Sequence, residues 1–227
     1  MTIFKGDSRS RRKDRLSENE PDSTSLESTG RALTVWRGDA ISPHDLKRQG
    51  MFFPRAINGT RPNQPPADIS LWNHINGSPT GMSTHTSGYV STSISRMSAF
   101  RFLVERLGGN GYLYEIKITP NFIDAAGTLG GTYSKSREQE YSALGGIRFD
   151  QVKGWVKVSF STEGRYKSNA LYKSSRYATF AGGSIAPQLA GFPPGHWAWK
   201  KSPWHSYQIT TGRTEQDAAN RDREGNT

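Results

Sequence analysis

The 227-residue chain contains no cysteine, which excludes disulfide bonds, thiolate metal sites and a cysteine nucleophile. It also lacks any apolar run near the roughly 20 residues of a membrane-spanning helix. Hydrophobic residues make up only 33% of the chain, and its mean hydropathy is −0.72. The start of the chain has basic residues but no apolar segment behind them, so it does not have the pattern of a secretory signal peptide. The length is typical of one domain with tails.

The formal net charge of +10 is concentrated in the middle of the chain. Residues 1–30 carry six basic and six acidic side chains, and residues 209–227 carry three basic and four acidic ones, which leaves +11 on residues 31–208. A basic body favours an anionic partner such as nucleic acid, a membrane surface or a phosphate-bearing ligand. A solvated basic face has the same composition, so charge alone does not choose among these.

Composition divides the chain into three parts. Residues 1–31 are polar, serine-rich and without hydrophobic periodicity, and residues 209–227 have the same character, so we expect both to be disordered. The folded domain is expected over residues 32–208. Its class is predicted to be α+β, because strand signals outnumber helix signals after residue 110.

Helix and strand signals within the domain are local. Residues 56–88 are rich in Asn, Gly, Pro and Thr and are expected to be mostly loop. The clearest helix follows Ser95 as N-cap and closes at Gly108. Its expected apolar face consists of Met97, Phe100, Leu103, Val104 and Leu107. Other helices are expected over 43–49 and about 69–74, and strands over 32–36, 88–94, 112–119, 140–149 and 152–161.

Two features are rich in groups that bind ligands. Arg37 comes directly after the opening strand and is followed by Asp39. A guanidinium there suits a bidentate grip on phosphate, although a lone arginine at a strand end is usually a surface residue. Residues 91–93 read Ser-Thr-Ser within a strand. They would direct hydroxyls at a ligand or a carboxylate, although such residues also occur in ordinary half-exposed strands.

Two carboxylates form the third feature. In an extended segment Glu138 and Glu140 would project from the same side, with Cα atoms about 6–7 Å apart. Like charges repel unless a cation or a function compensates. Paired carboxylates suit reactions at an anomeric carbon, while an ordinary charged loop is the alternative. The fourth feature is His74, at an expected helix end. The five histidines show no ligand spacing, so no metal site is predicted.

Together, these residues resemble the motifs of the mono-ADP-ribosyltransferase toxins. The likeness is strongest to the catalytic A chains of cholera toxin and heat-labile enterotoxin. Arg37, the Ser-Thr-Ser at 91–93 and the stretch 138–147 are similar to the family's Arg, Ser-Thr-Ser and Glu-x-Glu motifs. Residues 71–74 and 185–199 are similar to two further segments. The likeness runs in the same order and with similar spacing from about residue 33 to 206.

The resemblance implies a split β-sandwich of two perpendicular sheets with flanking helices and an NAD cleft between the sheets. It assigns Glu140 as the catalytic carboxylate that stabilises the ribosyl cation as nicotinamide leaves. Glu138 would deprotonate the acceptor guanidinium, Ser91 would orient Glu140, and His74 would support the site.

The resemblance also assigns the residues that bind NAD, the substrate that donates ADP-ribose. Arg37 would hold a phosphate of NAD, with Asp39 nearby on the adenosine side. Gly38, Thr92 and Ser93 complete the implied binding residues. No metal is implied.

The implied function is that of a bacterial toxin or effector that transfers ADP-ribose from NAD to an arginine of a host protein. Toxins of this type use a host activating factor, and their target is a G-protein α subunit. Without the family's cysteine pair and signal peptide, we expect no B pentamer and delivery into the host cell by another secretion route. NAD glycohydrolase, transfer to nucleic acid and an inactive binding module remain alternatives, with nucleic acid the less favoured acceptor.

Overall fold

A computed structural model of the chain describes residues 34–55, 67–77, 86–180 and 182–208. The disorder expected for residues 1–31 and 209–227 lies outside these residues, as do parts of the loop expected over 56–88. The strands are β1 (Thr34–Asp39), β2 (Met51–Phe52), β3 (Tyr89–Ser93), β4 (Gly111–Lys117), β5 (Phe122–Asp124), β6 (Glu140–Leu144), β7 (Ile147–Arg148), β8 (Val152–Ser159) and β9 (Thr162–Ser168). The helices are α1 (Pro43–Gln49), α2 (Leu71–Asn76), α3 (Arg96–Leu107), α4 (Ala125–Leu129) and α5 (Ser174–Tyr177).

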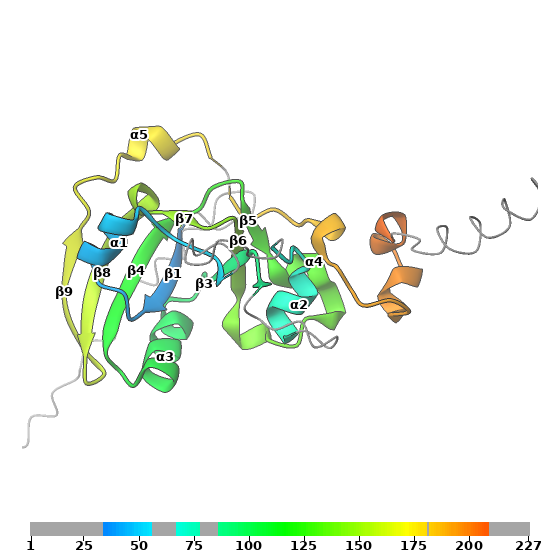
Figure 1. Cartoon of the computed structure of the whole chain (residues 1–227), viewed down its shortest axis with the longest axis horizontal. Helices are drawn as coiled ribbons and strands as arrows, with labels where there is room; N and C mark the ends of the chain where they lie inside the picture. The colour runs from blue at the N-terminus through cyan, green and yellow to red at the C-terminus, as the bar shows by residue number, and fades with distance from the viewer. Residues whose placement is uncertain (1–33, 56–66, 78–85, 181, 209–227) are drawn as a thin grey trace, which may run out of the picture.

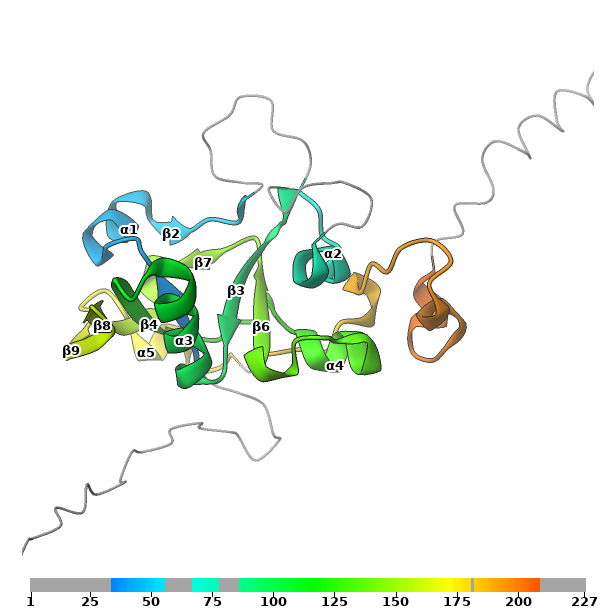
Figure 2. The same cartoon turned by 90° about the horizontal axis from the view of Figure 1, so that it is seen from below.

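A seven-stranded antiparallel sheet in the order β5-β6-β3-β1-β4-β8-β9 organises the molecule (Figure 1). β1 is paired with β4 along its whole length, but β1 and β3 are joined only at the pair Trp36 and Ser93. In Figure 2, β3 and β6 run lengthwise in the view whereas β4, β8 and β9 are foreshortened. The two expected sheets are therefore two halves of one sheet, which meet at a seam between β1 and β3.

α3 covers one face of the β1–β4–β8 half. Its N-cap Ser95 accepts a hydrogen bond from the Ser98 amide, and Gly108 ends the helix with a left-handed φ of 67°. α3 approaches β1 closely because position 38 is glycine: a Cβ there would lie 2.6 Å from the carbonyl oxygen of Ala99 and 3.0 Å from the Cβ of Leu103.

Alternation along the strands supplies a core on each face of the sheet. Trp36 of β1 and Leu113 of β4 pack under α3. The next residue in each strand faces the other way, so Val35 and Tyr114 pack on the opposite face of the sheet. There they meet α1 and the small sheet of β2 and β7. A third cluster joins α2 and α4 to the late loop of the chain. Its buried members are Leu71, Ile75, Tyr89, Ile123, Ala125, Leu129, Ala186, Ala190, Phe192, Ala198 and Trp204.

The α+β class and the main helices are confirmed, but several boundaries differ. The strand expected over 140–149 is split, because Gly145 and Gly146 adopt positive φ angles between β6 and β7. α2 begins at Leu71 rather than residue 69, because the Ser70 side chain caps it. Met97, expected on the apolar face of α3, is 48% exposed.

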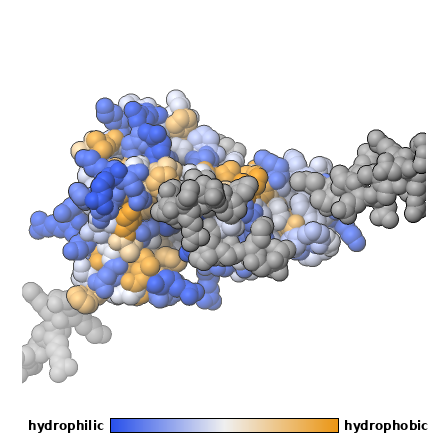
Figure 3. All heavy atoms as spheres, viewed as in Figure 1, coloured by the Kyte–Doolittle hydropathy of each residue, from blue (hydrophilic) through white to orange (hydrophobic). Residues whose placement is uncertain are grey.

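The far edge of the sheet, β9, is a strand that the sequence did not predict. All seven of its residues are exposed, so it carries no apolar alternation to mark it. On the face shown in Figure 3, hydrophilic residues gather over β9 and over α1. Among the described residues, no helix has the length and apolar character needed to span a membrane.

Candidate active site

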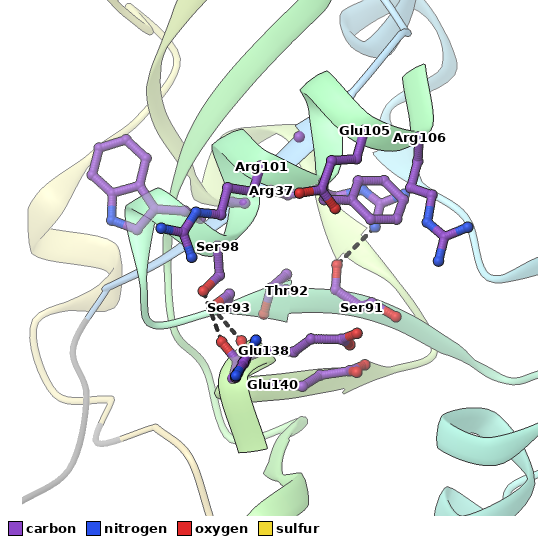
Figure 4. A pocket seen from close by; sticks show the side chains of 15 residues that line it. Arg37, Ser91, Thr92, Ser93, Ser98, Arg101, Glu105, Arg106, Glu138 and Glu140 are labelled. Atoms are coloured by element: carbon purple, nitrogen blue, oxygen red, sulfur yellow. Dashed lines mark hydrogen bonds between the residues drawn. The ribbon is translucent and has the colours of Figure 1, made fainter. Parts of the chain in front are cut away.

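A cleft of about 320 Å³ opens at the seam between β1 and β3, with α3 as one wall (Figure 4). Its floor carries residues of β1, β3 and β6 and of the short 3₁₀ helix η4 (Ser136–Glu138). The lining residues are Trp36, Arg37, Gly38, Ser91, Thr92, Ser93, Ser98, Ala99, Arg101, Phe102, Glu105, Arg106, Arg137, Glu138 and Glu140. Seven of the nine residues named from the sequence therefore meet here. The other two, His74 and Asp39, lie directly behind lining residues.

Glu140 begins β6 and is fixed on the floor of the cleft. Only 5% of the residue is exposed. Its Oε1 lies 3.0 Å from Nε2 of His74 and accepts a hydrogen bond of 2.8 Å from the Ser142 hydroxyl. Its backbone amide donates to the Tyr133 hydroxyl at 3.2 Å. These contacts hold the carboxylate in one orientation.

The environment of Glu140 favours its charged form. Burial raises the pKa of Glu140, but the hydrogen bond and charge of His74 and the hydroxyls of Ser142 and Ser91 act in the opposite direction and prevail. The net result is a pKa below the ordinary glutamate value, so the side chain is an ionised carboxylate at neutral pH.

His74 reaches Glu140 from α2. Its Nε2 is also 3.0 Å from the Ser91 hydroxyl, and its Nδ1 is 2.7 Å from the Ser87 hydroxyl. The helix is held by its buried residues Leu71 and Ile75. The imidazole, only 10% exposed, is therefore fixed at both ring nitrogens. Sequence placed His74 near the site, and its contact with Glu140 supplies the physical reason.

Glu138 lies in a different environment from Glu140. The prediction that both glutamates lie in one extended segment is wrong for Glu138. Glu138 ends η4, and Gln139 adopts a left-handed φ of 44° before β6 begins. Even so, Figure 4 shows the two carboxylates pointing the same way into the cleft. The Glu138 side chain is 55% exposed, and its nearest cation is Lys135 at 3.9 Å. Glu138 is thus open to solvent and to a ligand.

Arg37 links the two halves of the sheet. Its Nη1 donates to the Ser91 carbonyl oxygen at 2.7 Å, across the seam. Its Nε and Nη2 both bind Oδ2 of Asp39, at 3.0 and 2.7 Å. The guanidinium also lies over the Phe52 ring, 5.3 Å from its centroid. Asp39 therefore holds the guanidinium in place.

The hydroxyls of Thr92 and Ser93 bind protein carbonyls. Thr92 donates to the carbonyl oxygen of Tyr141 in β6, and Ser93 donates to that of Glu138. These bonds attach β3 to the segment that carries both glutamates. In this geometry the two residues position the catalytic candidates, and their hydroxyl oxygens can still accept a hydrogen bond at the cleft.

The α3 wall was not among the site residues predicted from the sequence. Its cleft-facing residues Ser98, Arg101, Phe102, Glu105 and Arg106 repeat at i, i+3, i+4, i+7 and i+8, which is one face of a helix. The same spacing can be read in the sequence, where it marks a second helix face next to the apolar one. Also not predicted were Tyr133 and Ser142, which contact Glu140, and Ser87, which contacts His74. Among the residues described here, no three His, Asp or Glu side chains gather as a metal site requires.

Comparison with known proteins identifies relatives of the whole domain. The model of the heat-labile enterotoxin alpha chain family matches residues 23–227. The A chain of the Vibrio cholerae cholera enterotoxin is 36% identical over 178 residues, which covers 75% of this chain and 68% of the relative. The NAD(+)–arginine ADP-ribosyltransferase Chelt of Vibrio cholerae is 30% identical over 203 residues, which covers 82% of this chain and 33% of Chelt.

A solved structure shares the fold. The crystal structure of an Escherichia coli heat-labile enterotoxin with a buried valine changed to lysine superposes with a TM-score of 0.66 at 34% identity. The match covers 78% of this chain and 98% of that one. The family resemblance and the ADP-ribosyltransferase-like fold predicted from the sequence are both confirmed. The chain belongs to the heat-labile enterotoxin alpha chain family.

Proposed function

We propose that this chain is a toxin or effector enzyme that transfers ADP-ribose from NAD to an arginine side chain of a host protein and releases nicotinamide. The observation that carries the proposal is the buried, ionised carboxylate of Glu140 on the floor of a cleft of small-molecule size. The relative named as an NAD(+)–arginine ADP-ribosyltransferase supports the same reaction.

Glu140 has the properties that the first chemical event requires. The bond between the nicotinamide nitrogen and ribose C1′ breaks, its electron pair leaves with nicotinamide, and positive charge develops on the ribose. A carboxylate already fixed in place stabilises that charge without reorganising. With a proton on Nε2, His74 donates to Glu140, while its Nδ1 forms a second hydrogen bond, with the Ser87 hydroxyl. His74 is then a positioning residue that keeps the carboxylate both charged and oriented.

Glu138 is suited to the second event. Its exposed carboxylate lines the cleft and points the same way as that of Glu140 (Figure 4). We assign it to accept a proton from the guanidinium of the target arginine as a guanidinium nitrogen forms its bond to C1′. A carboxylate also attracts the positively charged acceptor before the reaction, which favours arginine as the target.

Arg37 and its neighbours form the proposed NAD-binding edge of the cleft. The guanidinium of Arg37 is held by Asp39 and the Ser91 carbonyl oxygen, and we assign it a phosphate contact and the bracing of the seam. Gly38 lines the cleft and keeps α3 close to β1. Thr92 and Ser93 fix β3 against the segment with the glutamates.

The partners follow from the same proposal. The +11 charge of residues 31–208 suits an acidic protein target such as a G-protein α subunit. We further propose a host activating factor, delivery into the host cell by a route other than a B pentamer, and no role for metal or nucleic acid.

The test uses labelled NAD with agmatine, a small guanidine acceptor, and separately with host lysate. Wild type is compared with Glu140→Gln, Glu138→Gln and the control Glu163→Gln, a β9 residue outside the cleft. We expect Glu140→Gln to lose nicotinamide release and transfer by about 10²–10³-fold, because the oriented charge is removed. Glu138→Gln should keep nicotinamide release and lose transfer, and the control should match wild type.

Each alternative gives its own result. Free ADP-ribose without labelled agmatine or labelled protein indicates an NAD glycohydrolase. Label in the nucleic-acid fraction of the lysate indicates a transferase for nucleic acid. No consumption of NAD by the wild-type protein refutes the enzyme and supports an inactive binding module.

A further inference from the structure

The α3 wall of the cleft has no assigned role in the reaction, yet its composition is specific. Beside the face that packs on β1 through Ala99 and Leu103, α3 presents a second face of charged and aromatic residues to the cleft. Arg106 and Phe102 lie one turn apart on this face, so their side chains are neighbours. Phe102 is 49% exposed and lines the cleft, which leaves an unpacked aromatic surface available to a ligand.

Arg37 alone does not balance the charge of NAD. The diphosphate of NAD carries two negative charges. The Nε, Nη1 and Nη2 atoms of Arg37 already bind Asp39 and the Ser91 carbonyl oxygen, and the charge of Arg37 is matched by that of Asp39. A second cation on the same side of the cleft would therefore strengthen the binding of the diphosphate.

Arg106 is placed to provide this charge. In Figure 4 its side chain extends from α3 on the same side as Arg37 and Ser91, whereas Arg101 extends toward Ser98 at the other end. Within the described ranges, Arg106 forms no ion pair, so its guanidinium is available to a ligand. A guanidinium fork matches phosphate oxygens, and an exposed phenyl ring provides a face on which a purine stacks.

We propose that Arg106 and Phe102 form a second binding wall for the ADP half of NAD, which Arg106 binds at the diphosphate and Phe102 at the adenine. The proposal rests on the proposed function, since it names how the same cleft holds its substrate. The intervening Glu105 lines the cleft as well, and its carboxylate accepts hydrogen bonds only. That property suits the ribose hydroxyls, as acidic residues do in other dinucleotide sites.

The test measures binding directly, without turnover. ADP and adenosine are titrated by calorimetry into wild type, Arg106→Gln, Phe102→Ala and Arg165→Gln. Arg165 is an exposed arginine of β9 and controls for the loss of one charge. We expect Arg106→Gln to weaken ADP binding about tenfold and to leave adenosine binding unchanged, because a charge-assisted contact to phosphate is lost. Phe102→Ala should weaken both ligands, and Arg165→Gln neither.

Two further measurements separate this wall from other roles. In steady state, Arg106→Gln should raise the KM for NAD and keep kcat within about twofold, since the contact is made equally in ground and transition states. Thermal unfolding of Arg106→Gln should match that of Arg165→Gln, which excludes misfolding as the cause. Arg101→Gln tests whether the position of the charge matters, because Arg101 lies at the other end of the cleft. A loss of ADP affinity equal to that of Arg106→Gln would indicate a diffuse positive field and overturn the proposal.

The remaining outcomes are also decisive. Equal losses for ADP and adenosine in Arg106→Gln, no loss at all, or no ADP binding by wild type would each overturn the proposal. A KM change confined to the protein acceptor would overturn it as well and assign the wall to target recognition. If wild type binds ADP as expected but transfers no label, the proposed function fails while the binding wall stands.

Discussion

On the floor of the cleft, Glu140 is buried and bonded to His74, which in turn contacts the hydroxyls of Ser87 and Ser91. On the α3 wall opposite, Arg106 and Phe102 are exposed to the cleft, and Arg106 has no ion-pair partner in the described part of the chain. The floor is organised before any ligand arrives. The wall obtains its partners from a ligand.

The difference separates two tasks. A group that stabilises developing charge is effective when its orientation is fixed in advance, because no reorganisation is required during the reaction. A group that binds a long, charged substrate needs unoccupied hydrogen-bonding capacity and access from solvent. Removing parts of the floor should therefore change catalysis and stability together, while removing parts of the wall should change affinity alone.

The largest effect on this comparison is expected from His74→Ala. The change leaves the buried Glu140 without a principal hydrogen bond, and we expect kcat to fall about 10²-fold. The free energy of unfolding should fall by about 1–3 kcal/mol, because a buried charged group loses a partner. Steady-state kinetics and urea unfolding measure both.

Two further variants make the His74 prediction specific. His74→Gln retains an amide donor and should recover part of the activity, whereas the exposed His44→Ala on α1 should behave as wild type. As the pH is lowered, His74→Ala should lose activity at a higher pH than wild type does, because the imidazole no longer lowers the pKa of Glu140. An unchanged profile would mean that His74 acts only through packing.

A smaller effect is expected from Gly38→Ala, which displaces the whole wall but changes none of its cleft-facing side chains. The added Cβ meets the carbonyl of Ala99 and the Cβ of Leu103, so α3 must move away from β1. We expect a loss of about 1–3 kcal/mol in unfolding free energy and weaker ADP binding. Gly131→Ala, where a Cβ meets nothing within 4 Å, is the control. A variant as stable as this control would show that α3 is not held tightly against the sheet.

The smallest effect is on stability in acid. The pKa of Glu140 is lower in the folded than in the unfolded state, so its contacts stabilise the fold fully above the unfolded value of about 4.3. That contribution is lost as the pH falls through the lower folded value. Urea unfolding from pH 7 to pH 3 should show a larger loss of stability for wild type than for Glu140→Gln. Parallel curves would contradict a buried, ionised Glu140.

The residues of the floor were more predictable from the sequence than those of the wall. Arg37 and Ser91 are more than 50 residues apart along the chain, and Ser91 and Glu140 are nearly 50 apart. Strand signals and family motifs nevertheless placed all three in one site. The strand pairing that brings them together is non-local and cannot be read from periodicity. The extended conformation assumed for Glu138 was wrong, because nothing in its local sequence signals the left-handed residue that follows.

The wall escaped prediction for a different physical reason. A helix was correctly placed over residues 96–107, and its buried face was sought in apolar residues. Its cleft-facing side is polar, so it looks like a solvated surface until the tertiary structure places it opposite Glu140. Met97 was expected inside and is exposed, whereas the small Ala99 is the residue that packs against β1. Packing distance, which hydropathy does not encode, decides between them.

The contact of Arg37 with the Ser91 carbonyl oxygen has a consequence for how such a cleft arises. In a fully paired sheet, the backbone of the adjacent strand would bind that oxygen and the two strands would close on each other. Here the side chain of Arg37 binds that oxygen instead, and the two strands are paired only at Trp36 and Ser93. The cleft is thus a place where main-chain pairing has been replaced by side-chain pairing.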